Sequence, residues 1–397
     1  MADTEDPIVI VSIARTPIGS FQGAFASVPA PQLGGAAIDA AVTRAGVPKD
    51  EVAEVLMGCV LPAGQGQAPA RQASRSAGLP DDVPCTTVNK MCGSGMKTVM
   101  MAFEALHARP GDVIVAGGME SMTNTPFILP KMRSGHRLGH TQVYDHMFLD
   151  GLEDAYDKGR LMGTYAEDTA ESYQFTREAQ DAFAITSLKR AKAANEDGSF
   201  DMEMTPFTVK TRKGEVQVTR DEQPFTADLA KIPQLKPAFR EGGTVTPANS
   251  SSISDGAAAL VLMRESEARR RKLRPLARIV SQATHAQAPA WFTTAPIGAM
   301  AKALATAGWE AGDVDLYEVN EAFAVVTMAA MRDLGLSHEI VNVHGGACAV
   351  GHPVGASGAR IIVTLLSALE KYDKTRGMAA LCIGGGEATA VAIERIA

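Results

Sequence analysis

Short apolar runs alternate with segments of helical periodicity through the first 121 residues of the chain. Residues 7–19 begin with a β-branched run typical of a buried strand, which ends at Pro17 and Gly19. Residues 31–46 then place Ala, Leu and Ile at helical spacing and end at a glycine. The alternation continues as strands at 52–61, 85–91 and 112–120 and as helices at 70–78 and 94–106. This order predicts an α/β fold whose mostly parallel sheet is covered on both faces.

A different pattern fills residues 122–253, where charged and Met-rich stretches replace the alternation. Only residues 176–195 have the periodicity of a long helix there, with Thr176 near its start. Strand-like runs return at 254–263 and 277–286. We therefore predict three parts: an N-terminal α/β half, an inserted loop domain and a C-terminal α/β half. Their predicted bounds are 1–121 with 254–273, 122–253, and 274–397, respectively.

An internal repeat connects the two halves. Residues 93–106 align with residues 356–369, and each segment runs into an apolar strand that ends in paired glycines. The aligned pairs are Ser94 with Ser357, Gly95 with Gly358, and Leu106 with Leu369. Two amphipathic helices can match by chance, but the second strand match favours duplication of an α/β unit. Cys92 and His352 both lie in the turn before their helix, so the repeat predicts a thiol and an imidazole at related helix N-termini.

Composition excludes several classes of protein. The 397 residues include 38 Lys and Arg against 45 Asp and Glu, a net charge of −7 that does not attract nucleic acid. No apolar run approaches the roughly 20 residues that span a bilayer, so no membrane association is expected. The acidic first residues lack the basic and apolar regions of a secretory signal, which predicts a cytoplasmic protein. Five cysteines without a CxxC pair argue for a reducing compartment and at least one free thiol.

Cys92 is the first candidate for chemistry. It stands in VNKMCGSGMK, between a predicted strand and a predicted helix, where Gly93 and Gly95 let the backbone approach a ligand. A helix N-terminus stabilises negative charge on sulfur, which is one way to activate a thiol. The alternative is a small buried apolar residue, as free cysteines often are. The flanking glycines favour a nucleophile.

The segment 344–360, HGGACAVGHPVGASGAR, offers a second candidate. His344, Cys348 and His352 are spaced four residues apart, as metal ligands on one helical face would be, but the glycines and Pro353 between them forbid that helix. We therefore predict no metal site. A glycine-lined loop that aims His352 into a cleft supplies the general base that a thiol nucleophile needs.

Two further polar groups follow predicted strands. Cys382 precedes three glycines, at the strand end where α/β folds place active sites, and is a candidate acid or base. Asn320 in YEVNEAFA is a candidate to hold a water or an oxyanion, with a helix N-cap as the alternative.

Four blocks, VNKMCGSGMK, NEAFA, GGACAVGHPVGASGAR and CIGGGEA, occur in the order and spacing of the thiolase signature blocks. The chain resembles the thiolase family over essentially its whole length. The resemblance implies two similar five-stranded α/β halves that form a five-layered α-β-α-β-α core with an inserted loop domain. It also implies condensation of two acetyl-CoA to acetoacetyl-CoA and CoA, or the reverse thiolysis.

The resemblance implies a role for each motif residue. Cys92 carries the acetyl group, His352 activates it, and Cys382 exchanges the α-proton of the second acetyl-CoA. A water on Asn320 completes one oxyanion hole with His352, and the N–H groups of Cys92 and Gly384 form the other. The implied kinetics are ping-pong. No cofactor or metal is expected, because both steps move only acyl groups and protons and the CoA thioesters are substrates. The implied assembly is a homotetramer, a dimer of dimers.

For substrate binding, the resemblance points to the inserted domain and to four side chains: Ser251, Met162, Phe239 and Phe292. A serine-rich turn and core aromatics are the structural alternatives. Trp291 and Phe292 predict a short acyl pocket. The sequence departs from the family pattern at Leu161, His344 and Cys348. Many members have His in place of Leu161, so a polar contact to CoA is not expected from this position.

Alternative functions remain open at this point. A thiolase acting on longer 3-ketoacyl-CoA chains has the same motifs. A decarboxylating ketoacyl-synthase type of enzyme uses two histidines and no second catalytic thiol, so Cys382 and Asn320 argue against it. Two alternatives do not involve acyl transfer. The chain could be a CoA-binding homologue without turnover, or a thiol-based redox or metal protein.

Overall fold

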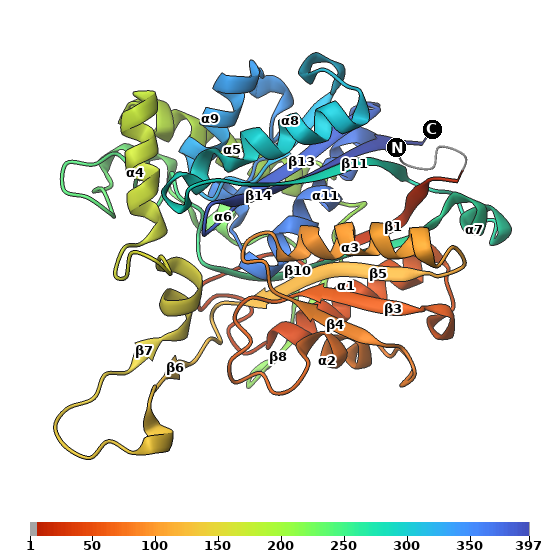
Figure 1. The fold of residues 1–397 in the computed structure, drawn as a ribbon, viewed down its shortest axis with the longest axis horizontal. Coiled ribbons are helices and arrows are strands. Elements are labelled where there is room, and N and C mark those ends of the chain that lie inside the picture. Colours follow the sequence, from red (N-terminus) through yellow and green to blue (C-terminus); the bar gives the residue numbers. More distant parts are fainter. Residues whose placement is uncertain (1–5, 397) are drawn as a thin grey trace.

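A computed structural model describes residues 6–396. Helices and sheets alternate in five layers (Figure 1). The first sheet has the order β4 (Cys85–Val88), β3 (Glu54–Gly58), β5 (Ile114–Ser121), β10 (Ser254–Arg264) and β1 (Ile8–Arg15). The second has the order β12 (Leu316–Val319), β13 (Arg376–Ile383), β14 (Glu387–Arg395) and β11 (Ala277–Ala286). A short antiparallel contact between β1 and β11 joins them.

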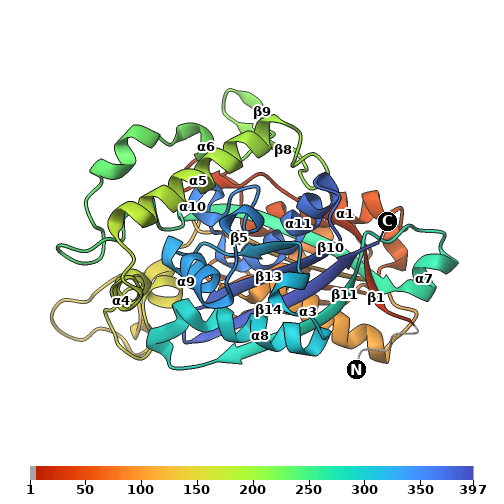
Figure 2. The ribbon, with the colours of Figure 1, turned by 90° about the horizontal axis from the view of Figure 1, so that it is seen from above.

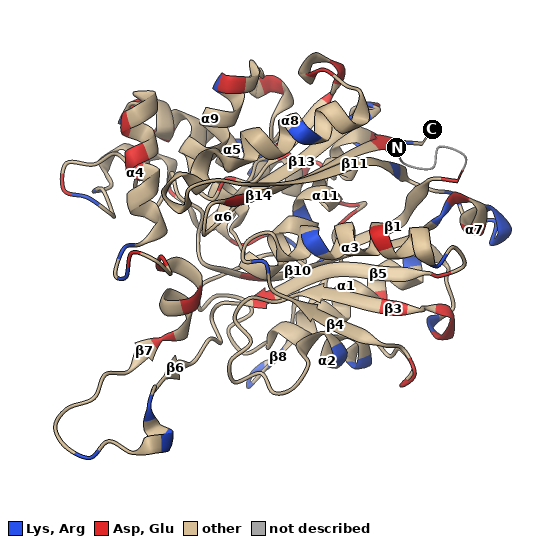
Figure 3. Cartoon of the chain, in the orientation of Figure 1, with Lys and Arg blue, Asp and Glu red and all other residues tan. Residues whose placement is uncertain are grey.

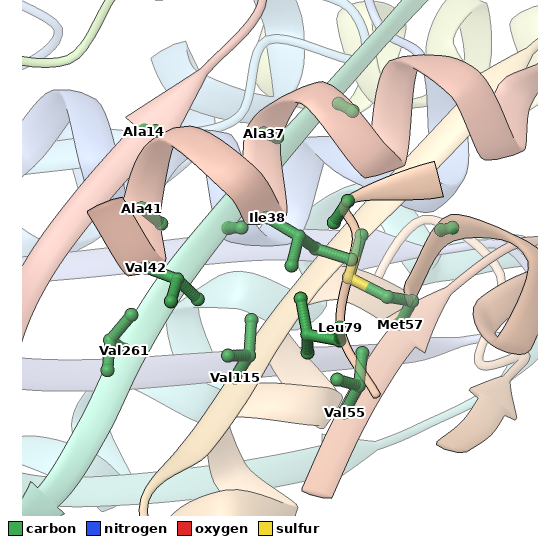
Figure 4. Close-up of a cluster of buried hydrophobic side chains, with 14 of the residues drawn as sticks. Ala14, Ala37, Ile38, Ala41, Val42, Val55, Met57, Leu79, Val115 and Val261 are labelled. Carbon is green, nitrogen blue, oxygen red and sulfur yellow. The ribbon is translucent and has the colours of Figure 1, made fainter. Parts of the chain in front are cut away.

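Two helices, α3 (Ser94–Ala108) and α11 (Val354–Lys371), form the central layer and share one apolar core with both sheets. The outer layers are α1 (Ala30–Ala45) with α2 (Pro69–Ser76), and α8 (Ala295–Ala307) with α9 (Ala324–Leu334). Figure 4 shows how α1 covers its sheet, with Ile38 and Val42 facing Val115 and Val261. The helical spacing read from the sequence therefore marks the buried face of this helix.

The strand directions repeat in the two halves, and they correct one prediction. The pairs β3 with β4, β3 with β5, and β12 with β13 are parallel, but β10 and β14 run antiparallel to both of their neighbours. The prediction of a mostly parallel sheet is wrong, because β14 follows β13 through the tight turn 384–386 rather than through a helix. A parallel bridge between Tyr317 and Val341 takes the place of a fifth strand in the second half.

The central helices approach each other through glycine. A Cβ on Gly95 of α3 would lie 2.8 Å from the Ala359 nitrogen, and a Cβ on Gly358 of α11 would lie 2.4 Å from the Met96 nitrogen. Both glycines lie in the first turns of their helices. The crossing therefore brings the two N-termini, with the turns that carry Cys92 and His352, into one region.

Residues 122–253 leave the first sheet after β5 and return to it at β10. They begin with a projecting arm built on β6 (Phe127–Ile128) and β7 (Tyr144–Asp145) (Figure 1). Two helices follow, α4 (Met162–Tyr173) and α5 (Arg177–Glu196). The second is the helix predicted at 176–195, and Thr176 caps it by accepting the Ala179 N–H. The segment also contains β8 (Phe207–Thr211), β9 (Gly214–Val218) and α6 (Gln223–Thr226), with short 3-10 or π-helical turns at Met132–Ser134, Phe148–Leu152 and Leu229–Gln234.

From above, α5 and α6 lie against α10 (Ala347–Val350), close to α11 (Figure 2). Acidic and basic residues are interspersed over the outer helices and loops, with a basic group at α7 (Glu265–Arg270) (Figure 3). Within residues 6–396, no helix combines the length and apolarity required to cross a bilayer.

Candidate active site

Cys92 lies in a tight turn between β4 and α3. Met91 adopts a positive φ of 47°, and Ser94 closes the turn by donating to the Met91 carbonyl at 2.6 Å and accepting the Lys90 N–H at 2.9 Å. A Cβ on Gly93 would lie 2.4 Å from Cδ1 of Ile383, so a larger residue here would displace that side chain. The turn is therefore packed against the end of β13.

The surroundings of the Cys92 thiol raise its pKa to about 11, chiefly through burial, and the Glu120 carboxylate adds to the effect. The N–H groups of Gly384 and of Cys92 itself bond to the sulfur and oppose this shift. The helix N-terminus therefore does not by itself ionise this thiol. The thiol is protonated at neutral pH and needs a base before it can attack.

His352 is the predicted base, and its hydrogen bonds define which ring nitrogen carries the proton. Its Nδ1 lies 2.6 Å from Oγ of Ser357, which donates its own proton to the Pro353 carbonyl at 3.0 Å. Nδ1 is then the protonated nitrogen, and Nε2 carries a lone pair with no partner among the described residues. Burial, aided by the charge of Arg360, lowers the pKa of His352 to about 3, so the ring is neutral.

Cys382 lies at the end of β13 and is fully buried. Burial raises the pKa of its thiol well above the usual value, and the neighbouring Cys92 raises it further. It packs in a cluster with Phe292, Ala322 and Phe323. The two thiols are therefore neighbours that approach the site from different halves.

Asn320 follows β12 and is 1% exposed, yet neither atom of its amide has a hydrogen-bond partner among residues 6–396. The N-cap alternative fails, because α9 begins at Ala324 and is preceded by Phe323. A buried amide without partners is costly, so a water or a substrate oxygen is needed to satisfy it. The next residue, Glu321, is instead held by Ser187, Asn342 and Cys348 and has a structural role.

The turn between β13 and β14 supplies a backbone donor. Gly385 and Gly386 have φ angles of 97° and 92°, which other residues rarely adopt. A Cβ on Gly384 would lie 3.3 Å from the Met162 sulfur. The Gly384 N–H lies near the Cys92 sulfur and opposes the rise of its pKa. The predicted oxyanion hole of Gly384 and Cys92 stays a prediction.

The predicted substrate contacts gather on the Cys382 side. Met162, Phe239 and Phe292 share its apolar cluster, and Phe239 packs directly over Gly163. Ser251 lies beside them, where its N–H bonds to the Ala322 carbonyl at 2.9 Å. Trp291, which the sequence placed with Phe292 on the pocket wall, is 41% exposed.

The three residues once considered as metal ligands face different partners. His344 packs against Phe200 and Tyr372, the Cys348 thiol faces the Glu321 carbonyl, and His352 bonds to Ser357. Over residues 6–396 the structure has no group of three or more His, Cys, Asp or Glu side chains able to hold a metal ion.

Two residues of the site escaped sequence reasoning. Ser357 orients His352, although the repeat had singled it out only as the counterpart of Ser94. Glu120 acts on Cys92 from the end of β5, and nothing in its local sequence pattern indicates that its side chain is buried.

Comparison with known proteins extends over both halves. Family models described as the thiolase N-terminal domain and the thiolase C-terminal domain match residues 8–266 and 273–395. An acetyl-CoA acetyltransferase of Rhizobium meliloti is 50% identical over 98% of this chain and 99% of its own length. The cytosolic acetyl-CoA acetyltransferase of Mus musculus is 48% identical over 98% of both chains. The crystal structure of Bacillus anthracis acetyl-CoA acetyltransferase is 39% identical, with a TM-score of 0.95 over 98% of this chain and 99% of that chain.

Proposed function

Because the chain belongs to the thiolase family, we propose that it is an acetyl-CoA C-acetyltransferase, which condenses two acetyl-CoA to acetoacetyl-CoA and CoA or runs the reverse thiolysis. Relatives with that name are about half identical over the whole length of the chain. The single observation in the site that carries the proposal is the pairing of two neighbouring thiols, Cys92 and Cys382, with a neutral imidazole at the start of the helix that crosses α3.

In the first half-reaction, Nε2 of His352 accepts the Cys92 proton as the sulfur attacks the acetyl carbonyl. The carbonyl oxygen accepts the N–H groups of Cys92 and Gly384 as it gains negative charge. When the tetrahedral intermediate collapses, the carbon–sulfur bond to CoA breaks and His352 returns the proton to the departing CoA thiolate. Cys92 is left as an acetyl thioester whose oxygen accepts the N–H groups of Cys92 and Gly384.

In the second half-reaction, the Cys382 proton passes to His352, and the Cys382 thiolate removes an α-proton from a second acetyl-CoA. The resulting carbanion attacks the acetyl carbonyl on Cys92 and a carbon–carbon bond forms. The Cys92 sulfur leaves with its electron pair and takes the proton that His352 holds. A thiolate on Cys382 is costly in its buried site, so proton removal must coincide with stabilisation of the enolate oxygen by His352 and Asn320. Every step moves an acyl group or a proton, so the proposal requires no metal or redox cofactor.

Substrate binding is assigned to the inserted segment 122–253 and to the cluster around Cys382. Met162 and Phe292 close the space beside this thiol, which supports acetyl and acetoacetyl chains over longer ones. Rates with acetoacetyl-CoA and with longer 3-ketoacyl-CoA substrates test this limit. Equal rates would favour the thiolase of broader chain length.

We further propose a cytoplasmic homotetramer, a dimer of dimers. The arm that carries β6 and β7 exposes apolar side chains, including Phe127 at 69% and Leu138 at 92%. Such a surface is typical of a protein contact. Light scattering of the protein and of a Leu138→Asp variant measures the assembly, and a monomeric wild type would contradict it. Cell fractionation tests the location.

An acetyl adduct tests the central step. The protein is mixed with acetyl-CoA, quenched in acid and digested, and the peptide that carries Cys92 is examined by mass spectrometry. We expect one acetyl group on Cys92 and none in a Cys92→Ser variant. If CoA binds but the adduct never forms, the chain is a CoA-binding protein without turnover.

A further inference from the structure

Glu120, near the end of β5, is a buried carboxyl that the proposed reaction does not use. It accepts backbone N–H bonds from Val60 at 2.9 Å, Leu61 at 3.2 Å and Gly355 at 3.0 Å. Its Oε1 lies 3.6 Å from the Cys59 sulfur. One side chain therefore ties the segment after β3 and the first turn of α11 to β5.

The packing around this carboxyl leaves no room for adjustment. A Cβ on Gly355 would lie 2.7 Å from Glu120 Oε2, and a Cβ on Gly118 would lie 2.0 Å from the Gly355 carbonyl oxygen. A Cβ on Gly58 would meet the same oxygen at 2.6 Å. The ends of β3 and β5 thus meet the start of α11 backbone to backbone, and the hydrogen bonds of Glu120 fix how they meet.

The segments that Glu120 joins are those that surround the nucleophile and carry the base. Val60, Leu61 and Val354 pack in one cluster with Cys92. Gly355 follows His352 by three residues. We propose, on the basis of the proposed function, that Glu120 is a positioning residue for acetyl transfer: its carboxylate sets where His352 stands relative to Cys92.

The charge of Glu120 has a second effect, on the pKa of Cys92, which can be measured separately from kcat. Two titratable groups face Glu120: the thiol of Cys59, after β3, and the thiol of Cys92, before α3. The groups that face Cys92 are Glu120 and the thiol of Cys382 on β13. Burial raises the pKa of Glu120 to about 7, so the carboxyl ionises near neutral pH. Its negative charge then disfavours a thiolate on Cys92.

Two variants separate position from charge. Glu120→Gln removes the charge and keeps one acceptor oxygen, whereas Glu120→Asp keeps the charge and withdraws the carboxylate by one methylene. For both we expect kcat of thiolysis to fall about tenfold or more with KM changed less than about threefold, because substrate binding is untouched. In Glu120→Gln we expect iodoacetamide to alkylate Cys92 about threefold faster at pH 8, and the pH midpoint of alkylation to be lower than in wild type. In Glu120→Asp, which keeps the charge, we expect the wild-type midpoint.

Asp315→Asn is the matched control. Asp315 also accepts two backbone N–H bonds, from Thr375 at 3.0 Å and Arg376 at 2.8 Å, but at the opposite end of β13 from Cys382. We expect wild-type kcat and a wild-type alkylation midpoint in this variant. A positioning role predicts loss of kcat in the Glu120 variants alone.

Wild-type kcat in Glu120→Asp, or an alkylation midpoint that does not move in Glu120→Gln, overturns the proposal. If Glu120→Gln does not fold, Glu120→Asp still decides the effect on kcat. Alkylation needs no acyl-CoA, so its result is independent of the proposed function. A wild type that never acquires an acetyl group refutes that function, whereas the alkylation midpoints still report whether Glu120 acts on Cys92.

Discussion

The two helices of the central layer, α3 and α11, begin after related turns that have different hydrogen bonds. In the first half, Ser94 bonds only to the backbone of its own turn, at Lys90 and Met91, and so fixes the place of Cys92. In the second half, the aligned Ser357 accepts from the side chain of His352 and orients its ring. The two halves therefore place Cys92 and His352 at equivalent positions before their helices. The hydrogen bond between Ser357 and His352 is the difference that orients a base in the second half.

The largest expected effect comes from removing the base. His352→Ala leaves the Cys92 thiol, with its pKa of about 11, without a proton acceptor. We expect the rate of Cys92 acetylation at pH 7 to fall about 10⁴-fold and to recover in part as the pH rises, because thiolate then forms without help. Rapid-quench measurement of the acetyl adduct from pH 6 to 10 checks this. A pH-independent defect would contradict the role of base.

Loss of the second thiol breaks only one half-reaction. In Cys382→Ala we expect Cys92 to acquire its acetyl group at about the wild-type rate, while condensation and thiolysis fall about 10³-fold. The adduct is followed by mass spectrometry and turnover by CoA release. Full steady-state turnover in this variant would refute the assigned role.

The two serines test the comparison directly. Ser357→Ala removes the partner of Nδ1, so we expect kcat to fall about tenfold, with the pH profile changed. Ser94→Ala removes only hydrogen bonds of the turn and is expected to lower the free energy of unfolding by about 1 kcal/mol without moving the pH profile. Denaturant melts and kcat from pH 6 to 9 distinguish them. Identical pH profiles in the two variants would mean that Ser357 does not control the imidazole.

A further effect, on stability rather than on catalysis, is expected at high pH. Folding raises the pKa of the Cys92 thiol to about 11, so above roughly pH 8.5 the unfolded chain releases a proton that the folded chain retains. The free energy of unfolding should therefore fall as the pH rises from about 8.5 to 11. Urea melts should show a shallower fall for Cys92→Ala than for wild type. Equal slopes would indicate that this thiol does not titrate differently in the two states.

Local patterns in the sequence predicted the strands and helices well, because burial of one face imposes a period that can be read residue by residue. The strand predicted at 277–286 has the bounds of β11, and the helix predicted at 94–106 is α3 without its last two residues. Strand direction was not readable in the same way. It depends on whether a connection is a turn or a helix and on which neighbour a strand finds, which is why the mixed order of the sheets was missed.

The sequence by itself determined the family motifs, the repeat and the identity of the thiols and the imidazole, because these are carried by residue types at fixed spacing. Only the tertiary structure decided the electrostatics that make them a site. The raised pKa of Cys92, the neutral His352 with a free Nε2 and the unpartnered amide of Asn320 all follow from burial among distant segments. Burial and hydrogen-bond partners arise when the halves meet, and no local pattern around Glu120 could indicate that its carboxyl would hold two of those segments together.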